Sequence, residues 1–135
     1  MTAPPPDPRV LALSPDPVDV GRARRFVGEV LADWGRLELG DVATLLVSEL
    51  VTNVVLHAGT VGELVVRRTG PAVRVEVHDR APALPRPRAH RPASTTGRGL
   101  GLLDDLAGAW GVVTEEGGKQ VWFEVGAGRA VHAAR

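Results

Sequence analysis

The stretch that decides the fold is Glu49-Leu50-Val51-Thr52-Asn53-Val54-Val55-Leu56-His57-Ala58, which lies near the middle of a chain of 135 residues. It continues an apolar run that begins at Leu45, and the whole run has the length of a helix. Residues four apart in a helix share one face, so Glu49, Asn53 and His57 would form a column with one turn between neighbours. Polar groups buried in an otherwise apolar helix need partners. The column therefore predicts a bound ligand, one that brings a metal ion.

The rest of the chain alternates between helical and extended patterns. Pro15-Asp16-Pro17 signals a helix start, Gly35 signals its end, and Val73, Val75 and Val77 alternate with polar residues as in a half-buried strand. This order predicts an α+β fold, a two-layer sandwich with helices on one face of a mainly antiparallel sheet. The expected helices cover residues 18–34, 41–57 and 97–109, and the expected strands cover 11–13, 63–67, 73–79, 112–114 and 120–125.

The stretch from Glu49 to Ala58 resembles the N box of an ATP-binding fold, the GHKL or Bergerat fold. Histidine-kinase catalytic domains, gyrase-type ATPases, one class of heat-shock chaperones and mismatch-repair ATPases share this fold. The chain is most similar to small stand-alone members, the anti-sigma-factor serine/threonine kinases and related bacterial regulators. The likeness implies a single ATP-binding domain over residues 10–126, between a disordered Pro-rich lead-in (1–9) and a tail (127–135).

The resemblance assigns roles to the polar column. Asn53 would hold the Mg²⁺ that bridges the ATP phosphates, and a side-chain amide oxygen suits this hard ion. Glu49 would accept the proton of the attacking hydroxyl, or would orient water for simple hydrolysis. His57 would reach a phosphate or cap the C-terminal end of its helix. An exposed helix glutamate and an internally bonded asparagine are the plain alternatives.

Asp79 matches the aspartate of the family's G1 box. A carboxylate at a strand end can accept a hydrogen bond from the adenine amino group; a turn-forming aspartate is the alternative. The family's Asp-x-Gly-x-Gly is replaced here by Asp79-Arg80-Ala81-Pro82-Ala83, which lacks both glycines. Near the C-terminus, Gln120 stands where relatives often carry a hydroxyl residue.

A glycine-rich segment after a long loop matches the family's G2 box: Gly97, Arg98, Gly99, Leu100 and Gly101. Glycines let backbone amides approach a phosphate, a following helix N-terminus favours negative charge, and an arginine adds a charge-assisted contact. The preceding Pro-rich segment, residues 80–98, would be the ATP lid. The motif is neither a P-loop nor a dinucleotide fingerprint, because the spacing of its glycines fits neither.

Composition narrows the remaining choices. Sixteen basic and sixteen acidic residues give a net charge of zero, so no basic field favours nucleic-acid binding. There is no cysteine, which excludes disulfides and thiolate metal sites. The first eight residues lack the basic and apolar regions of a signal peptide, and no run of eighteen apolar residues occurs, so we expect a cytoplasmic protein without a membrane span.

Three hypotheses follow. The first is an ATP- and Mg²⁺-dependent serine/threonine kinase of the anti-sigma-factor type, whose partners would be a sigma factor and a small protein antagonist that it phosphorylates. The second is a nucleotide-responsive binding module with little or no kinase activity, which the altered G1 box favours. The third, a fragment of a sensor kinase, is disfavoured because no second helical domain presents a phospho-accepting histidine. Relatives often form homodimers, so the resemblance also implies one here.

Overall fold

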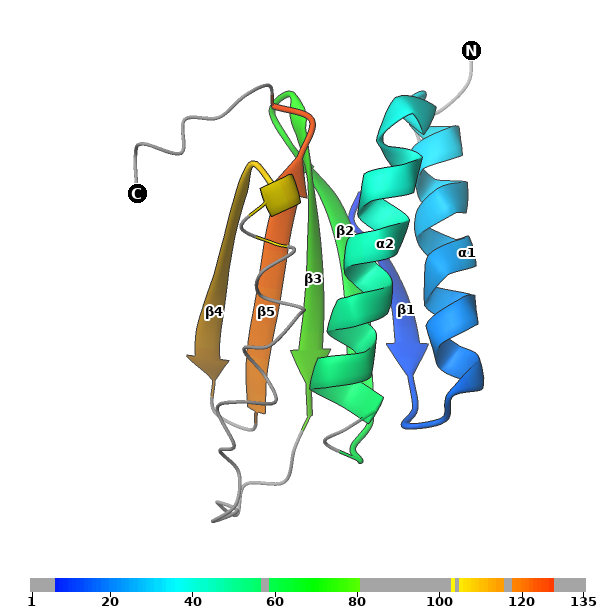
Figure 1. Ribbon diagram of the computed structural model, residues 1–135, viewed down its shortest axis with the longest axis vertical. Coiled ribbons are helices and arrows are strands. Elements are labelled where there is room, and N and C mark those ends of the chain that lie inside the picture. The colour runs from blue at the N-terminus through cyan, green and yellow to red at the C-terminus, as the bar shows by residue number, and fades with distance from the viewer. Residues whose placement is uncertain (1–6, 57–58, 81–102, 104, 116–117, 128–135) are drawn as a thin grey trace.

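The computed structural model of the chain describes residues 7–56, 59–80, 103, 105–115 and 118–127. The structure has a helical layer and a sheet layer (Figure 1). In chain order the elements are β1 (Arg9–Leu13), α1 (Val18–Asp33), the 3₁₀ turn η1 (Leu37–Leu39), α2 (Gly40–Val51), the π-helical turn η2 (Thr52–Leu56), β2 (Gly62–Thr69), β3 (Ala72–Asp79), β4 (Ala109–Glu115) and β5 (Gly118–Val125).

The described residues form a sheet of five strands in the order β1-β2-β3-β5-β4, and each neighbouring pair is antiparallel. In the part of the chain that the structure describes, α1 and α2 lie together on one face of this sheet (Figure 1). The predicted two-layer α+β sandwich is therefore confirmed. β1 starts at Arg9, one residue before the predicted start of the domain.

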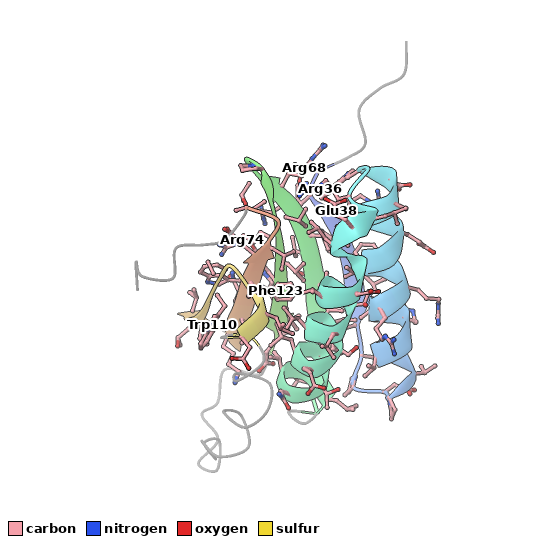
Figure 2. The ribbon with its side chains drawn as sticks, turned by 45° about the horizontal axis from the view of Figure 1, so that its top comes forward. Arg36, Glu38, Arg68, Arg74, Trp110 and Phe123 are labelled. Atoms are coloured by element: carbon pink, nitrogen blue, oxygen red, sulfur yellow. The ribbon has the colours of Figure 1, made fainter. Side chains whose placement is uncertain are left out.

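The core fills the space between the two layers. Phe123 from β5 points into this space (Figure 2), and Leu64, Val75, Leu31 and Leu46 are also fully buried there. The strand residues alternate because successive side chains point to opposite faces, so only every second position enters the core. This period-2 pattern is the one that predicted β3.

The third predicted helix is shorter at its C-terminal end than expected. Leu103, Asp105 and Leu106 are helical, and the Ala107 amide donates to the Leu103 carbonyl at 3.0 Å. The expectation that the helix continues to Ala109 is wrong, because β4 already begins there and pairs with β5. The partner strand β5 is long, and pairing with it extends β4 beyond the apolar run, residues 112–114, that predicted this strand.

One helical segment, Leu37–Leu56, is long and apolar enough to cross a membrane by length and composition alone. This is weak evidence, because the core helix of a soluble protein passes the same test. Here the apolar side chains of α2 and η2 pack against the sheet, including Leu46, Leu50, Val51 and Val55. Burial in the core accounts for the composition of this helix, and a cytoplasmic location stays a prediction.

The face of the sheet turned away from α1 and α2 carries a charged cluster around Glu76. Its carboxylate is hydrogen-bonded to Nε of Arg67 at 3.1 Å, Nε of Arg74 at 2.8 Å and Nε2 of His78 at 2.9 Å. Glu76 is only 5% exposed. Burial raises the pKa of its carboxyl, but the hydrogen bonds from His78, Arg74 and Arg67 outweigh burial and lower the pKa below its ordinary value.

The β2–β3 hairpin end of the sheet is tied to the helices by arginines (Figure 2). Arg36 donates to the carbonyl oxygens of Pro71 at 2.8 Å and Gly126 at 3.4 Å. The Arg68 guanidinium lies 4.6 Å from the ring centroid of Trp34. These contacts fix the end of the molecule where β3 begins, whereas the candidate functional residues lie where β3 ends.

Candidate functional site

The C-terminal part of the α2–η2 helix carries two of the predicted site residues. Glu49 lies in the last turn of α2, and Asn53 is the second residue of η2. Both side chains are half-buried, while the neighbouring Leu50 and Val54 belong to the core. Within the described residues, neither the Glu49 carboxylate nor the Asn53 amide has a hydrogen-bond partner. Half-buried polar groups without protein partners suit an external polar ligand.

The last turn of this helix differs from the expected α-helix. The helix expected over residues 41–57 is observed from Gly40 to Leu56, but its last turn, residues 52–56, is π-helical. The Thr52 hydroxyl donates to the Ser48 carbonyl at 2.8 Å, and such bonding to the preceding turn bends helices. A π-helical turn is wider than an α-helical turn, so the four-residue column cannot be extended past Asn53 by α-helical geometry. His57 itself lies outside the described residues.

β3 brings Asp79 to the same end of the molecule. Asp79 is the last residue of β3, is 7% exposed, and stands opposite Lys119 of β5 in the sheet register. It continues the face formed by Val75 and Val77, as the alternation predicted. Its Oδ1 accepts a hydrogen bond of 2.7 Å from the Thr60 hydroxyl. The buried position is confirmed, and a role in reading adenine stays a prediction.

Gly62 explains how the end of the helix and the end of β3 come together. It begins β2 and pairs with Asp79 in the register. A Cβ atom added at Gly62 would clash with the carbonyl oxygen of His78 and would lie 3.0 Å from Cγ2 of Val55 in η2. A residue without a side chain is therefore needed where η2, β2 and β3 meet. Figure 1 shows the lower end of this helix beside the end of β3.

Several predicted site residues cannot be placed. The G2 residues from Gly97 to Gly101 lie outside the described residues, as does the predicted ATP lid except for its first residue, Arg80. The Arg80 guanidinium donates to Oε1 of Glu63 at 2.6 Å, and its amide donates to the Val61 carbonyl at 3.0 Å. The first lid residue is thus fixed to the β2 side of the sheet.

The sequence motifs assign no role to Thr60, although its hydroxyl is the group that contacts Asp79. They point instead to Gln120, where relatives often carry a hydroxyl. Gln120 pairs with His78, so by register it belongs to the opposite face of the sheet from Asp79. A local signal did exist, because Thr60 follows a glycine in the short connection between the N-box helix and the next strand.

Comparison with known families agrees with this arrangement. A family model described as the histidine kinase-like ATPase domain matches residues 13–125. The match spans most of the chain, and the chain belongs to this family. No curated protein matches the chain. The resemblance drawn from the N box is confirmed at this level: the protein carries an ATP-binding domain of the histidine kinase-like type.

The described residues fit a nucleotide-bound Mg²⁺ better than an all-protein metal centre. In the described part of the chain, no group of three or more histidine, aspartate or glutamate residues gathers to hold a metal. Mg²⁺ commonly takes only one or two protein oxygens and shares substrate phosphates and water for the rest. The amide oxygen of Asn53, half-buried and without a partner in the described residues, is a suitable single ligand.

Proposed function

We propose that this protein is an ATP- and Mg²⁺-dependent serine/threonine kinase of the anti-sigma-factor type. It would bind a sigma factor and phosphorylate a small protein antagonist, so that phosphorylation switches the partnership. The observation that carries this proposal is the placement of Glu49 and Asn53. Both are half-buried, unpartnered within the described residues, and at the end of the domain where Asp79 lies.

Each of the three residues has a distinct task in the proposed reaction. Asp79 accepts a hydrogen bond from the adenine amino group and so orients the base. Asn53 would hold Mg²⁺, which neutralises charge on the phosphates. The hydroxyl oxygen of a partner serine or threonine bonds to the γ-phosphorus while the bond from that phosphorus to the ADP oxygen breaks. Glu49 accepts the proton that this hydroxyl loses.

A second candidate is a nucleotide-responsive binding module that transfers no phosphate. The absence of both G1 glycines from Asp79-Arg80-Ala81-Pro82-Ala83 favours it. Glycines at these positions would allow the backbone to approach the nucleotide closely. In this case the protein binds ATP and changes its affinity for a partner, and Glu49 has no part in a reaction.

Calorimetric titration of ATP with and without Mg²⁺ tests the site shared by both candidates. The wild-type protein should bind ATP more tightly with Mg²⁺ than without it. Asn53→Ala should lose this difference, because it removes the amide oxygen while leaving the helix intact. If wild-type protein fails to bind millimolar ATP in the presence of Mg²⁺, both candidates are wrong.

A transfer assay with Glu49→Gln then separates the two candidates. Wild-type protein is incubated with ATP labelled at the γ-phosphate and a soluble cell extract, and labelled small proteins are detected after electrophoresis. The kinase proposal predicts a labelled band that Glu49→Gln abolishes while ATP binding is kept. Glu29→Gln, at an exposed position of α1, removes a carboxylate elsewhere and should leave the band unchanged. Labelling that survives Glu49→Gln at the wild-type rate would exclude Glu49 as the base.

A further inference from the structure

We infer that Thr60 determines nucleotide specificity by orienting Asp79, so that the two side chains together offer only hydrogen-bond acceptors to the purine. This inference rests on the proposed nucleotide site at Asp79 and names the part of the ligand that the site reads. The part read is the 6-amino group of adenine. Thr60 is thereby a positioning residue that acts through Asp79.

The geometry of the contact supports an orienting role. The Thr60 hydroxyl donates to Oδ1 of Asp79 at 2.7 Å, a usual length for hydroxyl donors and one still within the range of charge-assisted bonds. Asp79 is 7% exposed, so this hydrogen bond stabilises a carboxylate that is largely removed from water. It is the one side-chain hydrogen bond between Asp79 and another described residue. The second carboxylate oxygen, Oδ2, remains able to accept a bond from a ligand.

The single proton of the hydroxyl decides what the pair can recognise. A threonine hydroxyl has one proton to donate and two lone pairs to accept with, whereas an ionised aspartate only accepts. Because Thr60 gives its proton to Asp79, neither side chain can donate to a ligand. Adenine carries an amino group at its 6-position, and this group is a hydrogen-bond donor. Hypoxanthine and guanine bring a carbonyl oxygen there, and two acceptors facing each other repel.

The connection that carries Thr60 is held on both sides. The amide of Gly59 donates to the carbonyl oxygens of Val55 at 3.0 Å and Leu56 at 3.2 Å. Gly59 has a φ of 70°, a conformation that favours glycine. On the other side, the Val61 carbonyl accepts the Arg80 amide at 3.0 Å. The hydroxyl is therefore in position before a nucleotide arrives, and such preorganisation lowers the entropic cost of binding.

The test measures affinities of four nucleotides by calorimetry in Mg²⁺: ATP, inosine triphosphate, GTP and purine riboside triphosphate, which lacks the 6-amino group. Wild-type protein should prefer ATP over purine riboside triphosphate by roughly 10- to 100-fold, the range for a hydrogen bond to a charged group. Thr60→Val keeps the side-chain shape without the hydroxyl and should reduce this preference at least about fivefold. Thr60→Ser keeps the hydroxyl and should restore it.

Thr69→Val is the matched control. The Thr69 hydroxyl is buried at the other end of β2 and has no hydrogen-bond partner among the described residues. Its removal should leave the ratio of ATP to purine riboside triphosphate affinity unchanged. The ratio of the two affinities is compared because a purely structural defect weakens the binding of both nucleotides alike.

The outcomes separate the two levels of the argument. If wild-type protein binds no ATP, the nucleotide site and this inference both fail. If wild-type protein prefers ATP and Thr60→Val keeps the full preference, the inference alone is overturned. Circular dichroism confirms that each variant is folded, and Thr60→Ala replaces Thr60→Val should the latter not fold. The inference stands if the preference falls in the variant without a hydroxyl and returns in Thr60→Ser.

Discussion

Replacing Glu76 by glutamine should destabilise the protein without changing its shape. The Glu76 carboxylate lies in the middle of the open sheet face and accepts bonds from Arg67 and Arg74, with His78 bound to its other oxygen. Glutamine has nearly the same volume, so packing is kept. Its neutral amide nevertheless offers one weaker acceptor and an NH2 group with two donors, and this NH2 group faces groups that are themselves donors. The change therefore removes the charge-assisted part of three contacts.

The size of the expected loss of stability depends on how far the arginine partners of Glu76 are buried. A hydrogen bond to a charged group contributes about 1.5–3 kcal/mol when both groups are shielded from water. Here Arg67 and Arg74 have side chains 41% and 22% exposed, so solvent screening reduces each contribution toward that of a surface pair. We expect a loss of about 2 kcal/mol in the free energy of unfolding. For a chain of this length, that corresponds to a fall of about 6–10 °C in Tm.

The same substitution should flatten the dependence of stability on pH. The folded-state pKa of Glu76 lies below its ordinary value of 4.5. The stabilisation is therefore fully present above pH 4.5 and is lost as the pH falls through the folded-state pKa. The gap between wild-type protein and Glu76→Gln should be largest near neutral pH. It should shrink steadily as the pH falls below 4.5, once the wild-type carboxyl takes up a proton.

Urea unfolding of both proteins across the pH range measures this gap directly. Glu124→Gln is the control, because Glu124 reaches Arg74 only at 3.6 Å and is 25% exposed. That change should cost less than about 1 kcal/mol. The reasoning is refuted if Glu76→Gln is as stable as wild-type protein at pH 7, or if the gap between them is the same at pH 7 and at pH 3.

Three other substitutions follow from local geometry. Gly62→Ala places a Cβ against the His78 carbonyl, so it should lower stability by about 2 kcal/mol or more and weaken ATP binding in calorimetry. Asp19→Asn should cost about 1–2 kcal/mol in urea unfolding, because the buried Asp19 carboxylate accepts both the amide and the hydroxyl of Ser14. Gly35→Ala should cost about 1 kcal/mol, since φ is 72° and open space surrounds it; a larger loss would indicate a clash that the structure does not contain.

The fold could be predicted because its signals are local and repeated. The first helix was expected over residues 18–34, and α1 covers Val18–Asp33. Alternation in β3 was expected and observed, since period 2 has no other plausible source over seven residues. The end of the third helix was missed because strand pairing decides it: the partner strand β5 recruits residues from Ala109 onward. The extent of pairing in this hairpin leaves no periodic trace in the residues from Ala109 onward.

The site was predicted only in part, for a related reason. Asn53 and Asp79 were predicted from residue type and spacing, and the elements that carry them meet at one end of the domain, while their roles stay predictions. Thr60 was missed because its importance depends on the close approach at Gly62, which is a contact between segments far apart in sequence. The π-helical turn was also missed, because hydrophobic periodicity over five residues does not distinguish it from an α-helical turn.

Strand β3 carries side chains that stabilise the fold and a side chain proposed to recognise the nucleotide, and it places them on opposite faces of the sheet. Glu76 and Asp79 are three residues apart, so they point to opposite faces of the sheet. The charges on the open face therefore do not contact the Thr60–Asp79 pair, which lies on the face that the helices cover. The two faces meet at His78, whose ring binds Glu76 and whose carbonyl lies against Gly62. Only backbone atoms connect the two faces at this point. A change in the Glu76 cluster should therefore affect the stability of β3 more than the nucleotide specificity at the end of that strand.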